Sequence, residues 1–172
     1  MLERPQSSEY HPYFERYIPL VEDGPLISIL QRQLDELHQF SANLTIEEEK
    51  YRYADDKWSV KEVIGHMADV ERVLSYQIFA IARGDSPTFQ PFNKDQYMKY
   101  STYNERPLQD ILFELAAVRL ATICLLKSSP DDTWLRTGTA LDHPTTVRAL
   151  AYVIAGHDKH HQNILKERYL HM

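Results

Sequence analysis

The segment Thr146–Ile164, TVRALAYVIAGHDKHHQNI, decides the fold expected for this chain. Its core-facing positions recur every three or four residues, as on a helix in a bundle: Val147, Leu150, Ile154, His157, His161 and Ile164. The pattern predicts a helix with one buried face, on which two histidines occupy positions that usually hold Leu or Ile. Because an unpartnered buried polar group costs about 1–3 kcal/mol, both imidazoles need partners.

The spacing of these two histidines indicates what the partner is. Imidazoles four residues apart on one helix can converge on a single divalent ion. His160 also lies three residues from His157, but only His161 keeps the register of Ile154. We therefore expect His157 and His161 to be metal ligands, with His160 on the flank or behind them. The alternative is two core histidines hydrogen-bonded to buried tyrosines or carboxylates.

Three further segments have helical periodicity, so the sequence predicts an all-α four-helix bundle. The expected helices span about residues 25–44, 59–83, 107–129 and 145–169. The second has the clearest boundaries, because Ser59 and Glu62 form a capping box and Gly84 follows the last turn. We expect a single domain over residues 1–172.

The connections between these helices are long, which predicts crossovers rather than simple hairpins. Residues 1–22 contain three prolines and are expected to be irregular, and residues 45–57 form an acidic linker. Residues 85–106 are rich in Pro, Phe and Tyr and should cross along the bundle, with a short helix at 94–99. Residues 130–144 are expected to form a loop, and no segment alternates convincingly enough to predict a strand.

Composition excludes several classes of partner. The 172 residues carry a net charge of −6 with no basic stripe, which argues against nucleic acid. The most apolar segment, 111–126, is interrupted by Glu114 and Arg119 and is too short to span a bilayer. A single cysteine, Cys124, permits no intrachain disulfide, so a cytoplasmic location is expected.

His66 is the candidate third ligand. It lies on the edge of the apolar face of the second helix, one turn from Val63 and Val70. Taken alone, His66 would be interpreted as a half-buried histidine with a satisfied hydrogen bond and not as a metal ligand. Together with His157 and His161, it completes a set of three histidines. Three histidines with one open position are typical of a catalytic zinc site, and imidazole also suits nickel, iron and copper.

Other chemically active side chains have plainer interpretations. Cys124 is expected to be a buried, inert thiol, and Arg119 a paired or snorkelling arginine, with an anion contact as the alternative. Asp158 is placed on the polar flank of its helix, which leaves no obvious general base. The remaining loop and tail histidines are expected to be exposed: His11, His143 and His171.

Two stretches resemble a known family. Trp58–Asp69, WSVKEVIGHMAD, is similar to the start of the second helix of DinB/YfiT-like proteins, and Gly156–His161, GHDKHH, resembles their C-terminal HxxxH motif. Ala117–Arg119 and Thr146–Tyr152 are similar to the third and fourth helices of that family. The resemblance covers roughly residues 25–170.

The resemblance implies a four-helix bundle, often dimeric, with a divalent metal on three histidines, here His66, His157 and His161. Characterised relatives include S-transferases and isomerases that use thiols such as bacillithiol or mycothiol. We therefore expect a metal-dependent S-transferase in which zinc or nickel activates a small thiol against an electrophile, held between one end of the bundle and residues 85–106. The alternatives are hydrolysis by a metal-activated water and a metal that only stabilises the fold.

Overall fold

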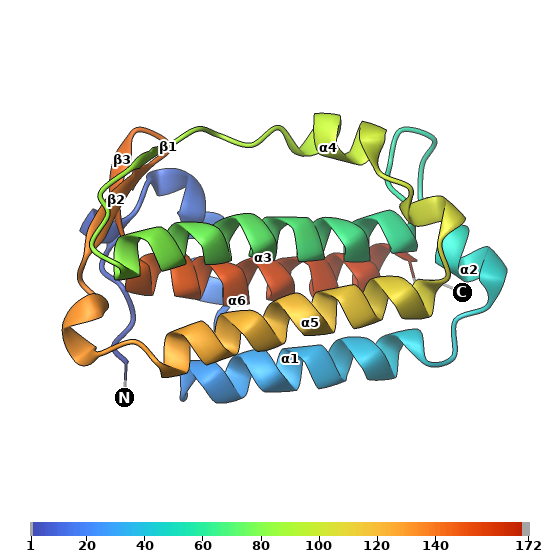
Figure 1. Ribbon diagram of the computed structural model, residues 1–172. Helices are drawn as coiled ribbons and strands as arrows, with labels where there is room; N and C mark the ends of the chain where they lie inside the picture. Colours follow the sequence, from blue (N-terminus) through green and yellow to red (C-terminus); the bar gives the residue numbers. More distant parts are fainter. Residues whose placement is uncertain (1, 170–172) are drawn as a thin grey trace.

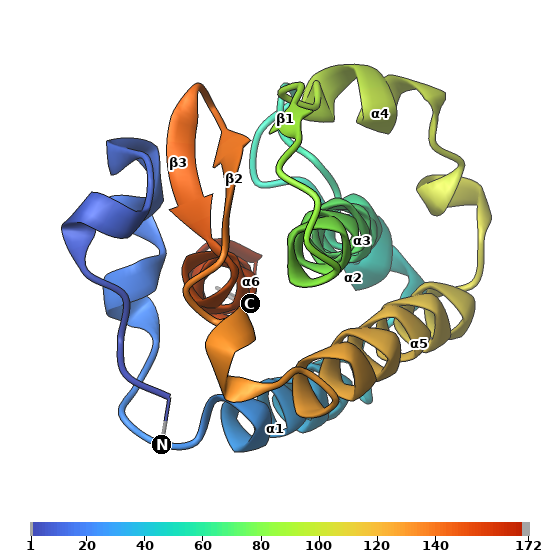
Figure 2. The ribbon, with the colours of Figure 1, turned by 60° about the vertical axis from the view of Figure 1, so that its left-hand side comes forward.

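The computed structural model describes residues 2–169, in which four long helices form a bundle (Figures 1 and 2). They are α1 (Leu26–Ser41), α3 (Val60–Ala82), α5 (Leu108–Lys127) and α6 (Val147–Ile164). The expected all-α four-helix bundle is confirmed. The α3 and α5 helices run in the same direction, because the segment between them returns along the whole bundle (Figure 1). This segment is the predicted crossover.

The helix boundaries follow local capping chemistry. Ser59 precedes α3, its hydroxyl accepts a hydrogen bond from the Glu62 backbone, and the Glu62 carboxylate accepts one from the Ser59 backbone. Beyond α3, Gly84 has a φ of 87°, a conformation that glycine adopts without strain. Thr146 caps α6 through the Ala149 backbone N–H. These contacts satisfy backbone groups that the first and last turns leave unpaired.

Two short helices lie in the connections. The predicted short helix in the crossover is α4 (Lys94–Tyr100), capped by the Asn93 side chain. The acidic linker contains a further short helix, α2 (Ile46–Lys50), which the sequence did not predict. Thr45 and Glu48 form a second capping box there, which can start a helix of a single turn.

The structure also contains a small sheet that the sequence did not predict. Its strands are β1 (Thr88–Phe89), β2 (Thr137–Ala140) and β3 (His143–Thr146), with β1 parallel to β2 and β2 antiparallel to β3. Leu141 and Asp142 form the tight turn between β2 and β3, with φ values of 53° and 58°. Such turns favour Asn and Gly, so the Leu-Asp pair gave no hairpin signal.

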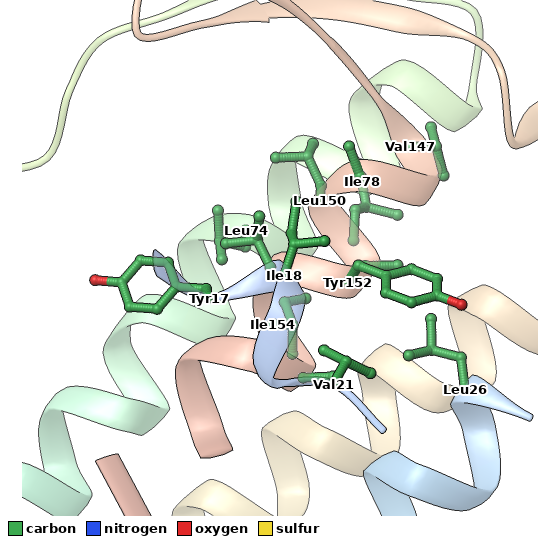
Figure 3. Packing of buried hydrophobic residues seen from close by; sticks show 14 of the residues in the cluster. Tyr17, Ile18, Val21, Leu26, Leu74, Ile78, Val147, Leu150, Tyr152 and Ile154 are labelled. Carbon is green, nitrogen blue, oxygen red and sulfur yellow. The ribbon is translucent and has the colours of Figure 1, made fainter. Parts of the chain in front are cut away.

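The N-terminal segment is more ordered than its composition suggested. It forms three short 3-10 turns, Ser7–Glu9, Pro12–Arg16 and Ile18–Leu20, and lies against the outer side of α6 (Figure 2). Tyr17 and Ile18 are buried and belong to the same core cluster as Leu150 and Ile154 (Figure 3). The segment therefore covers the face of α6 that the rest of the bundle leaves open.

Candidate functional site

Three imidazoles converge between α3 and α6. The ring centroid of His66 lies 5.1 Å from that of His157 and 5.0 Å from that of His161. The Nε2 atoms of His157 and His161 are 3.1 Å apart. One nitrogen from each of the three rings lies within 4.8 Å of the others. The structure thus brings together the three histidines that the sequence singled out.

Close packing next to two of these histidines holds the surrounding chain in place. Gly65 precedes His66, and a β-carbon on Gly65 would lie 2.5 Å from the ring of Tyr103. Gly156 precedes His157, and a β-carbon there would overlap the backbone carbonyl of Tyr17. Both neighbours approach the helix backbone at positions that only glycine permits.

The site favours neutral imidazoles. Burial lowers the pKa of His66 to about 4, with a smaller contribution from nearby Lys94. Burial, followed by the neighbouring imidazoles, lowers the pKa values of His157 and His161 well below their usual range. All three rings are therefore unprotonated at neutral pH, which is the form that binds metals.

The donor set fits a divalent transition metal. Two nitrogens bound to one zinc ion at about 2.0–2.1 Å lie about 3.3 Å apart in tetrahedral geometry, close to the spacing between His157 and His161. The donor nitrogens of all three histidines lie within 4.8 Å of one another, so at most a small movement of a ring would bring the whole set to this spacing. The Nδ1 atom of His161 is buried and has no hydrogen-bond partner among residues 2–169.

His160 takes a different position from its neighbours. Its ring packs edge-on against Tyr17, with centroids 5.4 Å apart, and it is not one of the three convergent histidines. His161, which keeps the helical register of Ile154, lies in the convergent set, and His160 does not. Tyr17 also contacts His157, at 5.3 Å between centroids, so one aromatic ring packs against both histidines.

A buried ionic network lies beside the site. Arg119 is only 1% exposed, and its guanidinium donates hydrogen bonds to Glu71, Asp158 and the Leu30 carbonyl, each at 2.8 Å. Burial alone would lower the pKa of Arg119. The negative charges of Glu71 and Asp158, together with their hydrogen bonds, have the larger effect and raise this pKa. The expectation of a paired arginine is confirmed. The placement of Asp158 on a polar flank was wrong, because α6 is buried on all sides from Ala149 to Asp158.

A cavity of about 470 Å³ opens beside His66 and His157. Its position against the crossover agrees with the predicted pocket, but two of its walls were not predicted. They come from the N-terminal segment and from the turn between β2 and β3, which the sequence gave no reason to place near the histidines. The cavity is mainly apolar, with lining side chains that include Phe14, Tyr17, Val70, Leu74, Phe89 and Phe92.

The remaining candidates lie elsewhere. Cys124 is exposed on α5, so the expectation of a buried thiol was wrong. The α5 helix is apolar on nearly all sides, and its sequence therefore does not identify the inward face. His11 and His143 are half-buried near one another, with ring centroids 6.1 Å apart, and His11 lines the cavity. His171 lies outside the described residues.

Comparisons with known proteins agree with the architecture. The structure of YfiT from Bacillus subtilis matches with a TM-score of 0.72 and 18% identity, over 88% of this chain and 95% of YfiT. That protein is described as a probable metal-dependent hydrolase with an unusual four-helix bundle topology. No curated protein matches the sequence. Within residues 2–169, no helix combines the length and apolar character needed to cross a membrane.

The family is established by sequence as well as by fold. The sequence profile of the DinB superfamily matches residues 29–165, which include His66, His157 and His161. With the bundle, the crossover and this match in agreement, the chain belongs to the DinB superfamily.

Proposed function

We propose that the protein is a metal-dependent enzyme that transfers a low-molecular-weight thiol to an apolar electrophile. His66, His157 and His161 would hold a divalent ion, with zinc or nickel the best match to three imidazoles. When bound, such an ion supplies Lewis acidity, which lowers the pKa of a coordinated thiol or water and provides a nucleophile at neutral pH.

The openness of the site supports catalysis over a structural role. Structural zinc sites are closed by four protein ligands, whereas catalytic sites keep a position free. Here His66 and His157 face a cavity of about 470 Å³, large enough for a small organic substrate. The aromatic rings of Trp58 and Tyr17 pack against His66 and His157, and they would limit the access of water to these rings.

The scarcity of acidic groups in the cavity supports a thiol over water as the nucleophile, and this observation carries the proposal. Asp142 is the only carboxylate among the lining residues, and it is exposed at the turn between β2 and β3. Asp158 is held by Arg119 in the core. A metal-bound thiol loses its proton outright and needs no general base, whereas hydrolysis normally requires a group that accepts a proton from water.

Lys94 supplies a positive charge near the site. It lines the cavity, and its ammonium lies 5.0 Å from the ring centroid of Trp58, which itself packs on His66. An anionic cosubstrate would be attracted to this position. Small cellular thiols generally carry carboxylate or phosphate groups, so Lys94 would guide such a thiol towards the three histidines.

The test is thiol conjugation by metal-loaded protein. Monochlorobimane serves as the electrophile, and bacillithiol, mycothiol, glutathione and coenzyme A are compared as thiols. We expect at least one thiol to react faster with the protein present, and a chelator or the His66→Ala change to remove the acceleration. The matched control, His160→Ala, should retain it. Rates unchanged with all four thiols would contradict the transferase proposal.

Hydrolysis is the second candidate, supported by the description of YfiT. The same three histidines would serve both reactions, so the two differ in the nucleophile. If the protein cleaves 4-nitrophenyl esters in the absence of thiol, and does so only with metal, hydrolysis becomes the better assignment. Metal-dependent stability without either reaction would instead favour a structural metal.

We also propose that two copies associate through α5. The outer face of this helix carries apolar side chains that are exposed in the single chain, with Phe113 at 76% and Leu120 at 63%. Ala117 and Cys124 extend the same exposed stripe. Sedimentation should detect a dimer that Leu120→Glu disrupts, while the control Ile46→Glu, on the equally exposed α2, leaves it intact. A monomer at all concentrations would refute this assembly.

A further inference from the structure

Gln77 on α3 has an unexplained polar group. Its side chain is 7% exposed, and its carbonyl oxygen Oε1 has no hydrogen-bond partner among residues 2–169. Buried polar atoms are nearly always paired, because leaving one unpaired forfeits its hydration without replacement. A buried amide without a partner is therefore a candidate for a ligand contact.

The position of Gln77 relates it to the three histidines. His66, Val70, Leu74 and Gln77 follow one stripe of α3, and all four line the same cavity. Gln77 comes eleven residues after His66, so the helix rise places the two about 16 Å apart. The cavity thus follows α3 from the histidines to a single buried amide.

The walls between these two points are apolar. Val70 and Leu74 form the α3 side, Phe14 faces them from the N-terminal segment, and Phe89 covers them from the crossover. The charged lining side chains, Lys94 and Asp142, are exposed. The middle of a bound molecule would accordingly be uncharged.

The turn between β2 and β3 adds another apolar side chain to this lining. Leu141 lines the cavity and has a φ of 53°, in the left-handed region that branched, bulky side chains rarely adopt. Glycine or asparagine would form the same turn with less strain. Leu141 also packs against the hydrophobic core, and it adds a further apolar side chain to the cavity wall.

We propose that the substrate is an elongated, largely apolar molecule with a hydrogen-bond donor, a hydroxyl or amide N–H, at the end remote from its reacting group. The reacting group lies at the three histidines, and Gln77 accepts the hydrogen bond from the far end. This inference rests on the proposed function for the location of the reacting group. A rotation of the terminal amide is sufficient to turn Oε1 towards the ligand, because that bond has a broad, twofold preference. Gln77 would determine specificity without touching the reacting atoms.

Equilibrium dialysis of neutral probes tests the proposal. Methyl dodecanoate is compared with its ω-hydroxy derivative, whose extended chain matches the roughly 16 Å between His66 and Gln77. Methyl 11-acetamidoundecanoate is the third probe, which carries an amide N–H at the same end. We expect wild-type protein to bind the hydroxyl or the amide probe about fivefold more tightly than methyl dodecanoate, as one neutral hydrogen bond provides.

Variants assign that preference to Gln77. Gln77→Leu should remove the preference while retaining the affinity for methyl dodecanoate. Gln90→Leu is the matched control, since it removes an amide from the exposed rim of the same cavity, and it should keep the preference. If Gln77→Leu fails to fold, Gln77→Met removes the amide with less change in shape, and it should lose the preference in the same way.

The outcomes separate this inference from the proposed function. The dialysis is run on chelated and on metal-loaded protein, and the preference should be the same in both. Equal affinity of the wild type for all three probes, or a preference that persists in Gln77→Leu, overturns the inference even if metal-dependent turnover is observed. A preference carried by Gln77 in a protein without turnover supports the binding mode and removes only the proposed reaction.

Discussion

The backbone carbonyl of Tyr17 lies against Gly156, so closely that a β-carbon at position 156 would overlap it. The same tyrosine packs its ring on His157 and His160. The N-terminal segment is therefore joined to the three-histidine site through one residue. Tyr17 can be buried at this position because residue 156 has no side chain. In turn, the contact with Tyr17 explains why α6 has a glycine there.

Gly156→Ala should destabilise the protein by about 1–3 kcal/mol, the usual cost of forcing extra volume into a packed interior. Helix propensity acts in the opposite direction, since alanine is better than glycine by about 1 kcal/mol. Urea unfolding measures the balance. Gly65→Ala should be destabilising too, through Tyr103. A Gly156→Ala protein as stable as wild type would show that the contact with Tyr17 is not maintained.

The buried network gives a second prediction. Arg119→Met should cost about 3–5 kcal/mol, because it leaves Glu71 and Asp158 buried without their partner. The matched control is Arg72→Met, which breaks the exposed pair with Glu114 and should cost less than about 1 kcal/mol. Similar losses for the two variants, again from urea unfolding, would mean that the Arg119 network is worth no more than a surface pair.

The four long helices were predictable because their information is local. Ser59, Glu62 and Gly84 specify the ends of α3 through contacts within a few residues. The pairing of His157 with His161 followed from the periodicity of α6 alone. His66 was added to them from its place on the apolar face of its own helix, and the resemblance agreed, but its distance from α6 depends on how two helices pack and could not be predicted.

The sequence-based predictions failed where contacts between distant segments determine the structure. Asp158 was assigned to the surface because one apolar face was assumed for α6, whereas the N-terminal segment covers a second face of that helix. The hairpin turn at Leu141 and Asp142 lacks the residues that favour its geometry, so no local signal was present. Gln77 was not singled out, since a lone glutamine on a helix gives no indication of a cavity.

Acid should destabilise the metal-free protein through the buried imidazoles. The pKa of His66 is about 4 in the folded protein and about 6.5 in an unfolded chain. As the pH falls through this interval the unfolded chain takes up a proton that the folded protein excludes. Stability is therefore lost, by about 2 kcal/mol from His66 between pH 7 and 5.

Urea unfolding of chelated protein at several pH values measures this loss, and His157 and His161 should add to it in the same direction. His66→Gln should flatten the dependence, because glutamine does not titrate. Stability that stays constant from pH 7 to 5, or an unchanged slope in His66→Gln, would be inconsistent with buried neutral histidines.

We expect His66, His157 and His161 to hold one divalent ion in which His160 takes no part. Elemental analysis of protein purified without an affinity tag tests it most directly, on wild type, His161→Ala and His160→Ala. We predict one zinc or nickel ion per chain in wild type and in His160→Ala, and almost none in His161→Ala. Equal metal loss in the two variants, or a wild-type protein that binds no divalent metal even after incubation with it, would contradict the account.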